Sequence, residues 1–251
     1  MLYSKVYIVM PVYNEQACIE QVINDWLQVF DYLTGDSRLL IIDDGSTDGT
    51  SEILSRLSDI HPELLVLRKE NGGHGPAVMD GYRTALANGA EFIFQTDSDG
   101  QTDPANFERY CVPFIRENKY TEDVALFGMR KNRGDGKKRE MVEKVLCRMV
   151  KHYFGVSVQD ANAPFRIYRA EILKKYIDKV PDGYALPNVL LTSLIAKNET
   201  CAFVSIRFGR RKTGKNSINM RKIFVTGLKS MRDFSNFRET IFAEKNGEKG
   251  G

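Results

Sequence analysis

The first half of the chain alternates between short apolar runs and longer stretches in which apolar residues recur every three or four positions. The apolar runs, at residues 5–10, 39–43, 64–67 and 91–95, have the length of buried strands. The periodic stretches between them, at residues 15–30, 48–60 and 76–88, have the length of helices. Strands that alternate with helices over short links predict an α/β fold with a mostly parallel, Rossmann-like sheet flanked by helices.

The second half of the chain is less regular but contains the same two patterns. We expect further strands at residues 124–129, 164–168 and 201–208, and helices at residues 104–118, 137–154, 170–179 and 187–197. A loop rich in Arg, Lys and Gly occupies residues 209–217, and a helical pattern runs from residue 218 to about residue 242. Because no repeat or linker splits the chain, we expect one domain over residues 1–217, followed by an amphipathic helix and a frayed tail over residues 218–251.

Length and composition are those of a one-domain enzyme. The chain has 251 residues and a formal net charge of +3. No stretch approaches 18 consecutive apolar residues and residues 1–5 lack an apolar signal region, so we expect neither a membrane span nor a secretory leader. The four cysteines are scattered without paired spacing, which favours a reducing compartment over a zinc site or a disulfide framework. We therefore expect a cytoplasmic protein.

Positive charge is concentrated near the end of the chain. Residues 200–232 contain nine Lys or Arg and no Asp or Glu. An apolar stripe accompanies the later cations: Met220, Phe224, Leu228, Met231 and Phe234. Such a helix can make a peripheral contact with the inner face of a membrane, or it can pack its apolar face on the domain, which is commoner. Both interpretations stay open, whereas the modest total charge disfavours a nucleic-acid partner.

The strongest chemical signal is a group of oxygen-bearing side chains after the fourth apolar run. Asp97 and Asp99 lie one residue apart at the end of a predicted strand, so their carboxylates point the same way. Gln101 and Asp103 follow directly. Such oxygens suit a hard divalent cation, Mg²⁺ or Mn²⁺, which needs one or two protein carboxylates and completes its shell with phosphate oxygens. This group therefore predicts a metal-assisted site for a nucleotide diphosphate.

Polar segments also follow the other three predicted strands. Ligands of parallel sheets gather at the carboxyl ends of the strands, so residues 11–15, 43–48, 71–75 and 97–101 should share one rim. One acid of the Asp43–Asp44 pair could bind a base or ribose, or the pair could belong only to a helix cap. The glycine-rich residues 71–76 could admit a phosphate to their backbone N–H groups. His74 alone is more typical of a surface residue than of a catalyst.

Together, the four strand-end segments resemble the motifs of family 2 glycosyltransferases, inverting enzymes of the GT-A fold that use nucleotide-diphosphate sugars. The resemblance covers roughly residues 5–217. Residues 127–130, 160–166 and 210–217 are similar to segments of the dolichol- and polyprenyl-phosphate sugar synthases within that family. Met129 departs from the usual Ser, and residues 162–164 depart from the commoner Ser-Gly. Many members also carry membrane helices, which we do not expect in this chain.

The resemblance implies a role for each residue that matches a motif. It implies a nucleotide-sugar site that contains Pro11, Tyr13, Glu15, Asp44, His74, Asp97 and Ser217. It implies a metal site of Asp97, Asp99 and Gln101, and a catalytic group of Asp160, Arg130 and Arg211. Asp160 is the best candidate for a base or for a residue that positions the acceptor, but it could instead orient Arg166 or a nearby loop, and these interpretations stay open.

These expectations describe an inverting, metal-dependent transferase that moves a sugar from a UDP- or GDP-sugar to an acceptor, with polyprenyl phosphate as the leading acceptor. A lipid phosphate is already anionic and needs no strong base, whereas a hydroxyl acceptor needs a positioned carboxylate. The alternative is a soluble transferase to a polysaccharide or another hydroxyl acceptor in cell-surface glycan synthesis. A nucleotide-sugar-binding protein without turnover is a third class, which the intact pair of Asp97 and Asp99 disfavours.

Overall fold

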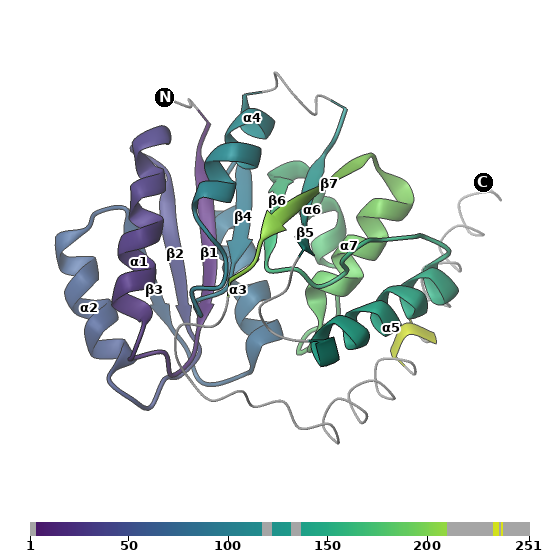
Figure 1. Cartoon of the computed structure of the whole chain (residues 1–251). Helices are drawn as coiled ribbons and strands as arrows, with labels where there is room; N and C mark the ends of the chain where they lie inside the picture. Colours follow the sequence, from purple (N-terminus) through teal and green to yellow (C-terminus); the bar gives the residue numbers. More distant parts are fainter. Residues whose placement is uncertain (1–3, 117–121, 132–136, 210–232, 236, 238–251) are drawn as a thin grey trace.

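The computed structural model describes residues 4–116, 122–131, 137–209, 233–235 and 237. Seven strands form one sheet in the order β3-β2-β1-β4-β6-β5-β7 (Figure 1). The strands are β1 (Val6–Val12), β2 (Arg38–Asp43), β3 (Leu64–Arg68), β4 (Phe92–Thr96), β5 (Ala125–Lys131), β6 (Phe165–Arg169) and β7 (Cys201–Arg207). Neighbouring strands are parallel except at β6, which runs antiparallel to both β4 and β5. The predicted mostly parallel sheet is therefore confirmed.

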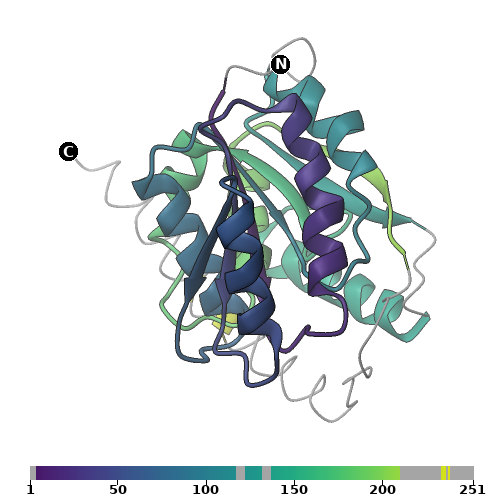
Figure 2. The same cartoon turned by 90° about the vertical axis from the view of Figure 1, so that its left-hand side faces the viewer.

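Helices cover both faces of this sheet (Figures 1 and 2). One face carries α1 (Ile19–Leu27), the 3₁₀ helix η1 (Gln28–Tyr32), α2 (Thr50–Ile60), the π-helical turn η2 (Phe107–Cys111) and α4 (Val112–Ile115). The other face carries α3 (His74–Ala87), α5 (Lys137–Phe154), α6 (Ala170–Ile177) and α7 (Pro187–Asn198). Side chains alternate along the strands, so each strand contributes to two apolar layers.

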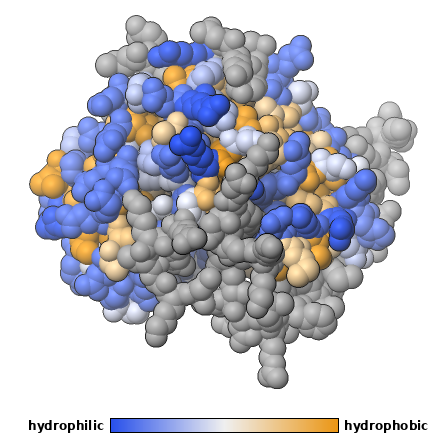
Figure 3. All heavy atoms as spheres, viewed as in Figure 1, coloured by the Kyte–Doolittle hydropathy of each residue, from blue (hydrophilic) through white to orange (hydrophobic). Residues whose placement is uncertain are grey.

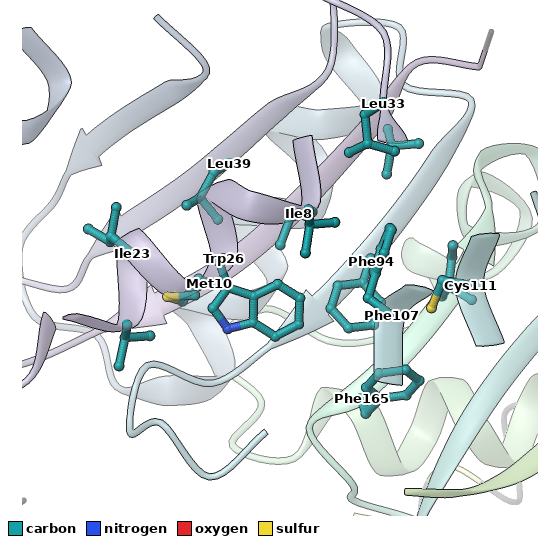
Figure 4. Close-up of a cluster of buried hydrophobic side chains, with 14 of the residues drawn as sticks. Ile8, Met10, Ile23, Trp26, Leu33, Leu39, Phe94, Phe107, Cys111 and Phe165 are labelled. Atoms are coloured by element: carbon teal, nitrogen blue, oxygen red, sulfur yellow. The ribbon is translucent and has the colours of Figure 1, made fainter. Parts of the chain in front are cut away.

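A cluster of aromatic rings fills the first of these layers (Figure 4). The ring of Phe94 in β4 lies 5.4 Å from Trp26, 5.0 Å from Phe107 and 4.9 Å from Phe165, measured between centroids. All four residues are fully buried, and burying one such side chain stabilises the fold by about 1.5–3 kcal/mol. The cluster therefore anchors the carboxyl end of β4, from which Asp97 and Asp99 follow.

The predicted elements are confirmed over most of the described chain, and α5 has the predicted bounds. The segment predicted as a helix at residues 104–118 is helical without a break from residue 105 to residue 115, and the clearest difference is the π-helical turn η2 within it, directly before α4. Pro113 lies in the first turn of α4. Its ring lacks an N–H and crowds the carbonyl group four residues earlier, which a widened π-helical turn relieves.

The reversed strand β6 brings a loop to the functional edge of the sheet. Thr96 at the end of β4 pairs with Phe165 at the start of β6. The residues just before β6, at positions 160–164, therefore lie at the same edge as the carboxyl ends of the parallel strands. Phe127 of β5 pairs with Arg166, so Arg130 leaves β5 at that edge too.

Of the apolar stripe predicted near the C-terminus, only Phe234 lies within the described residues. Phe234 is fully buried, and its ring lies 5.3 Å from Phe154 and 6.0 Å from Tyr153 of α5. At this position the apolar side chain packs on the domain, while Met220, Phe224, Leu228 and Met231 lie outside the described residues. Within the described ranges, no helix combines the length and apolar character that crossing a bilayer requires. Polar residues predominate on the described surface seen in Figure 3, with apolar residues scattered among them.

Candidate active site

A pocket of about 390 Å³ opens at the carboxyl ends of the first four strands. Its walls come from four segments that are far apart in the sequence: Pro11, Val12, Tyr13 and Glu15 after β1, Asp44 after β2, Asn71, Gly73, His74 and Ala77 after β3, and Asp97, Ser98 and Asp99 after β4. The predicted rim is thus confirmed. Six of the seven side chains predicted for the nucleotide-sugar site line this pocket, and the seventh, Ser217, lies outside the described residues.

Hydrogen bonds between the loops after β1 and β2 shape one wall of the pocket. Asn14 adopts a left-handed backbone conformation with a φ of 53°, which Asn tolerates better than most residues. Its side-chain oxygen accepts a hydrogen bond from the backbone N–H of Thr47 at 2.8 Å. Its own N–H donates to Ser46 Oγ at 3.0 Å, and the N–H of Glu15 donates to Thr50 Oγ1 at 3.0 Å. The Ser and Thr residues after β2 therefore hold the loop that carries Tyr13 and Glu15.

The two acids after β2 have different surroundings. The carboxylate of Asp43 accepts hydrogen bonds from the Ser46 backbone N–H at 3.0 Å and from Ser51 Oγ at 2.5 Å. These contacts fix the turn after β2 and the start of α2. For Asp43, this agrees with the alternative that the Asp43–Asp44 pair belongs to a helix cap. Asp44 instead lines the pocket while being only 3% exposed. Of the two acids, Asp44 is the one in a position to contact a nucleoside.

The glycine-rich segment after β3 supports Asp44. The backbone N–H groups of Gly72 and Gly73 donate to the two oxygens of the Asp44 carboxylate at 2.9 and 2.8 Å. The expectation that these groups would receive a phosphate is therefore wrong for this pair of N–H groups. Gly75 is required by packing, because a Cβ atom there would lie 2.1 Å from the backbone oxygen of Tyr184.

The carboxylates of Asp97 and Asp99 both line the pocket. Asp97 Oδ1 accepts a hydrogen bond from Gln95 Nε2 at 3.0 Å and lies 4.0 Å from His74 Nε2. Asp99 Oδ1 accepts a hydrogen bond from the backbone N–H of Gln101 at 3.1 Å. Among the described residues, no three His, Cys, Asp or Glu side chains cluster closely enough to hold a metal. Two carboxylates on an open pocket fit Mg²⁺ or Mn²⁺, which complete their shells with water and substrate phosphate oxygens.

The third residue predicted for the metal site, Gln101, is placed differently. Its side chain is buried, and its Nε2 donates to the backbone oxygen of Gly209 at 2.9 Å. The backbone oxygen of Gln101 in turn accepts from the N–H of Gly209 at 2.7 Å. Gln101 lines a neighbouring hollow of about 240 Å³. In this structure it ties the loop after β4 to the segment that follows β7.

A charged cluster lies at the same edge, beyond the reversed strand. The carboxylate of Asp160 accepts hydrogen bonds from Arg130 Nε at 2.7 Å and Arg130 Nη2 at 2.8 Å. Glu143 of α5 accepts from Arg130 Nη2 at 3.0 Å and from the backbone N–H of Ala161 at 2.8 Å. The guanidinium also stacks over Phe208, 5.4 Å from the ring centroid. These side chains are largely buried, so solvent screens the pairing weakly.

The two carboxylates of this cluster are tuned in opposite directions. Burial and the negative charge of Asp160 raise the pKa of Glu143, although the charge of Arg130 opposes them. Burial also acts to raise the pKa of Asp160, but the hydrogen bonds and charge of Arg130 outweigh it and lower the pKa below its usual value. Asp160 is therefore the ionised partner of Arg130, and Glu143 is the more readily protonated one.

Sequence reasoning missed Glu143, although a signal was present. In α5, Glu143, Cys147, Val150 and Phe154 recur on one face, and Val150 and Phe154 are buried. An acid on the buried face of an amphipathic helix requires a partner inside the protein. That rule could have singled out Glu143.

The hydrogen bonds of Arg166 go to partners other than the carboxylate of Asp160. Arg166 is fully buried and donates to the backbone oxygens of Ala163 at 2.7 Å and Asn188 at 3.0 Å, and to Thr192 Oγ1 at 2.9 Å. The hydrogen bonds of Asp160 go to Arg130 and to the backbone of its own loop. The roles of Asp160 and Arg130 in catalysis stay predictions, and Arg211 lies outside the described residues.

Comparison with known proteins identifies a sequence family and individual relatives of this chain. The sequence profile described as Glycosyl transferase family 2 matches residues 7–177. An undecaprenyl-phosphate 4-deoxy-4-formamido-L-arabinose transferase of Aeromonas hydrophila is 29% identical over 170 residues, which are 67% of this chain and 50% of that protein. A protein of the same name from Yersinia pestis is 26% identical over 223 residues, 88% of this chain and 64% of that protein. The chain thus spans between half and two thirds of the length of these relatives.

Solved structures share the architecture. Glucosyl-3-phosphoglycerate synthase from Mycobacterium tuberculosis, in complex with Mn²⁺ and UDP-glucose, aligns with a TM-score of 0.68 at 18% identity over 93% of this chain and 80% of that chain. The same enzyme in complex with phosphoglyceric acid aligns with a TM-score of 0.66 at 19% identity, over 93% of this chain and 81% of that chain. At such identities the likeness establishes the fold alone, and the predicted GT-A fold is confirmed.

Proposed function

The chain belongs to glycosyl transferase family 2, and from this premise we propose that it transfers a sugar, with inversion, from a UDP- or GDP-sugar to the phosphate of a polyprenyl phosphate. The observation that carries the proposal is the pocket that Asp44, Asp97 and Asp99 line together. A nucleoside contact and a cation site within one pocket match the chemistry of a nucleotide diphosphate. The names of the two undecaprenyl-phosphate sugar transferases support the acceptor class.

In the proposed complex, the nucleoside lies near Pro11 and Asp44 and the diphosphate lies near Asp97 and Asp99. A Mg²⁺ or Mn²⁺ ion held there would neutralise charge that develops on the leaving diphosphate. Asp44 is held rigidly by Gly72 and Gly73, so little ordering is needed when the nucleoside binds. His74 and Tyr13, both partly exposed on the pocket wall, would contact the donor.

The transfer step is a single displacement. An oxygen of the acceptor phosphate forms a bond to the anomeric carbon of the sugar while the bond from that carbon to the nucleotide diphosphate breaks. The electron pair of the broken bond leaves with the diphosphate. Arg130 provides a cation for the anionic acceptor, and Asp160 and Glu143 orient its guanidinium.

The surroundings of Asp160 favour a phosphate acceptor over a hydroxyl acceptor. A hydroxyl acceptor needs a general base with a pKa near the working pH. Both oxygens of Asp160 accept hydrogen bonds from Arg130, and its pKa is lowered. Such a carboxylate is a poor base and a good positioning group. The soluble transferase to a glycan hydroxyl is therefore the second candidate.

A transfer assay with the 251-residue chain tests the proposal. The chain is incubated with a panel of UDP- and GDP-sugars and Mn²⁺, and is offered undecaprenyl phosphate in anionic vesicles or soluble oligosaccharides. Mass spectrometry should detect a lipid-linked sugar phosphate with one donor and no glycosylated oligosaccharide. Sugar transfer only to the oligosaccharides would replace the first candidate by the second, and binding of donors without any product would contradict both. Sedimentation of the chain with the same vesicles reports whether it contacts membranes peripherally.

A further inference from the structure

A chain of buried polar side chains runs beneath the pocket on the face of the sheet that carries α3 and α7. Gln95 of β4 donates from Nε2 to Asp97 Oδ1 at 3.0 Å. Its own side-chain oxygen accepts from Asn188 Nδ2 of α7 at 3.1 Å. The side-chain oxygen of Asn188 accepts from the hydroxyl of Tyr82 in α3 at 2.9 Å. Gln95, Asn188 and Tyr82 are all buried.

Asn188 of α7 also connects this series of hydrogen bonds to the loop that holds Asp160. The backbone oxygen of Asn188 accepts hydrogen bonds from Arg166 Nη1 at 3.0 Å and from Thr192 Oγ1 at 2.7 Å. Arg166 also donates to the backbone oxygen of Ala163, three residues beyond Asp160. The guanidinium of Arg166 can only donate to the Asn188 backbone oxygen, and an ionised Asp97 can only accept from Gln95.

We infer that Gln95, oriented by Asn188, is a positioning residue that sets the carboxylate of Asp97 for cation binding. Burying an amide on a central strand is unfavourable unless its hydrogen bonds are made, and Gln95 makes one bond to Asp97 and one to the helix behind it. Since Oδ1 of Asp97 receives the Gln95 N–H, the rotation of that carboxylate is restricted at the wall of the pocket that Asp97 lines. This role rests on the proposed metal-assisted function of the pocket.

The test compares Gln95→Met with Thr96→Val. Methionine keeps the length and burial of Gln95 but removes both hydrogen bonds. Thr96 is the next residue of β4 and is also fully buried, and among the described residues its hydroxyl has no hydrogen-bond partner. The control therefore changes a fully buried polar side chain of the same strand without removing a hydrogen bond.

Water-proton relaxation with Mn²⁺, in the presence of UDP or GDP, gives the Mn²⁺ concentration at half-saturation without any turnover. Removal of an outer partner of a metal ligand weakens metal binding by about tenfold to a hundredfold, and we expect a shift of that size in Gln95→Met. The affinity for UMP or GMP without metal should be unchanged, and Thr96→Val should match the wild type in both readouts. A structural role alone would lower the melting temperature and leave the Mn²⁺ dependence unchanged.

Tyr82→Phe provides a second variant if Gln95→Met does not fold. It removes one hydroxyl, which three hydrogen bonds connect to Asp97 through Asn188 and Gln95, and should shift the Mn²⁺ dependence in the same direction but by less. Wild-type Mn²⁺ dependence in Gln95→Met, or in Tyr82→Phe if only that variant folds, overturns the inference. A wild-type chain that binds Mn²⁺ and a nucleotide but transfers no sugar contradicts the proposed function and leaves the role of Gln95 standing. A wild-type chain without any Mn²⁺-dependent nucleotide binding contradicts both.

Discussion

The two halves of the sheet edge present their charges in opposite ways. At the ends of β1–β4, the carboxylates of Asp44, Asp97 and Asp99 line an open pocket. At the carboxyl end of β5 and the start of β6, the guanidinium of Arg130 is enclosed by Asp160 and Glu143. All three side chains are at most 12% exposed. One half is open to a ligand and the other already pairs its charges internally.

This difference indicates how the proposed donor and the proposed acceptor would each bind to the protein. A donor diphosphate and its cation can enter a pocket whose acids are held in place by Gly72, Gly73 and Gln95. An anionic acceptor must instead compete with Glu143 or Asp160 for Arg130. The pKa of Glu143 is raised, so this carboxylate takes up a proton more readily than an ordinary one. Protonation of Glu143 would weaken its ion pair with Arg130 and leave the guanidinium available to a second anion.

The largest effect should follow from removal of a carboxylate of the open half. We expect Asp99→Ala to abolish transfer and nearly abolish metal-dependent nucleotide binding, because a hard cation would lose one of two protein ligands. Calorimetry with UDP and GDP, with and without Mn²⁺, measures this. Asp103→Ala changes an exposed acid of the same segment that lines the neighbouring hollow, and should retain the metal dependence. An unchanged diphosphate affinity in Asp99→Ala would sink the metal assignment.

The next effect should arise in the enclosed half. In Asp160→Asn, an amide NH₂ faces the Arg130 donors, so the guanidinium turns away from its present direction. A misplacement of about 1 Å can reduce the rate about a hundredfold. We expect a loss of that size in kcat with the donor KM unchanged.

Glu199→Gln is the matched control for Asp160→Asn. It removes the carboxylate of an ion pair with Lys175, at 2.6 Å, next to the start of β7 and thus at the opposite edge of the sheet. It should leave both kinetic constants unchanged. A rise in the donor KM of Asp160→Asn at constant kcat would contradict the division of the edge into donor and acceptor halves.

A smaller effect is expected from Asp44→Ala. A lost hydrogen bond to a charged group costs about 1.5–3 kcal/mol, so UMP or GMP should bind about tenfold to a hundredfold more weakly. The Mn²⁺ requirement should persist, because Asp97 and Asp99 are intact. Asp43→Ala serves as the comparison, since Asp43 holds the turn and should affect stability more than nucleoside affinity. Equal UMP and GMP affinities in Asp44→Ala and the wild type would refute the contact.

The smallest effect concerns stability and pH. The pKa of Glu143 is raised in the folded state, so the folded form binds its proton more tightly and stability falls as pH rises through the range above the ordinary value of 4.5. Glu143→Gln removes this titration. Its free energy of unfolding relative to the wild type should therefore increase as pH rises above that ordinary value.

Urea unfolding at several pH values measures this difference, and a constant offset caused by the new amide does not alter its slope. Asp160 has the opposite sign: its pKa is lowered, so its stabilisation is present above the ordinary value of 3.8 and is lost as pH falls through the lower folded pKa. A relative stability of Glu143→Gln that is independent of pH would show that the two carboxylates are not differently tuned.

The open half of the site was more predictable from sequence than the enclosed half, for a physical reason. Apolar periodicity locates parallel strands, and their carboxyl ends necessarily share one edge, so the four polar segments could be brought together without coordinates. The enclosed half depends on the reversed strand β6, which no local pattern signals, and on Glu143, which α5 brings from a distant position. The direction of Gln101 was also unpredictable, because its partner is the backbone of Gly209, more than a hundred residues later.

Calorimetry of the wild-type chain with UDP and GDP, in the presence and absence of Mn²⁺, tests the central claim most directly. We predict that one of the two nucleotides binds at a single site and that Mn²⁺ tightens its binding at least about tenfold, since Asp97 and Asp99 would hold the ion and its charge would favour the diphosphate. The corresponding monophosphate should bind with little dependence on Mn²⁺. Binding of neither nucleotide, or equal affinity with and without the metal, would contradict the account.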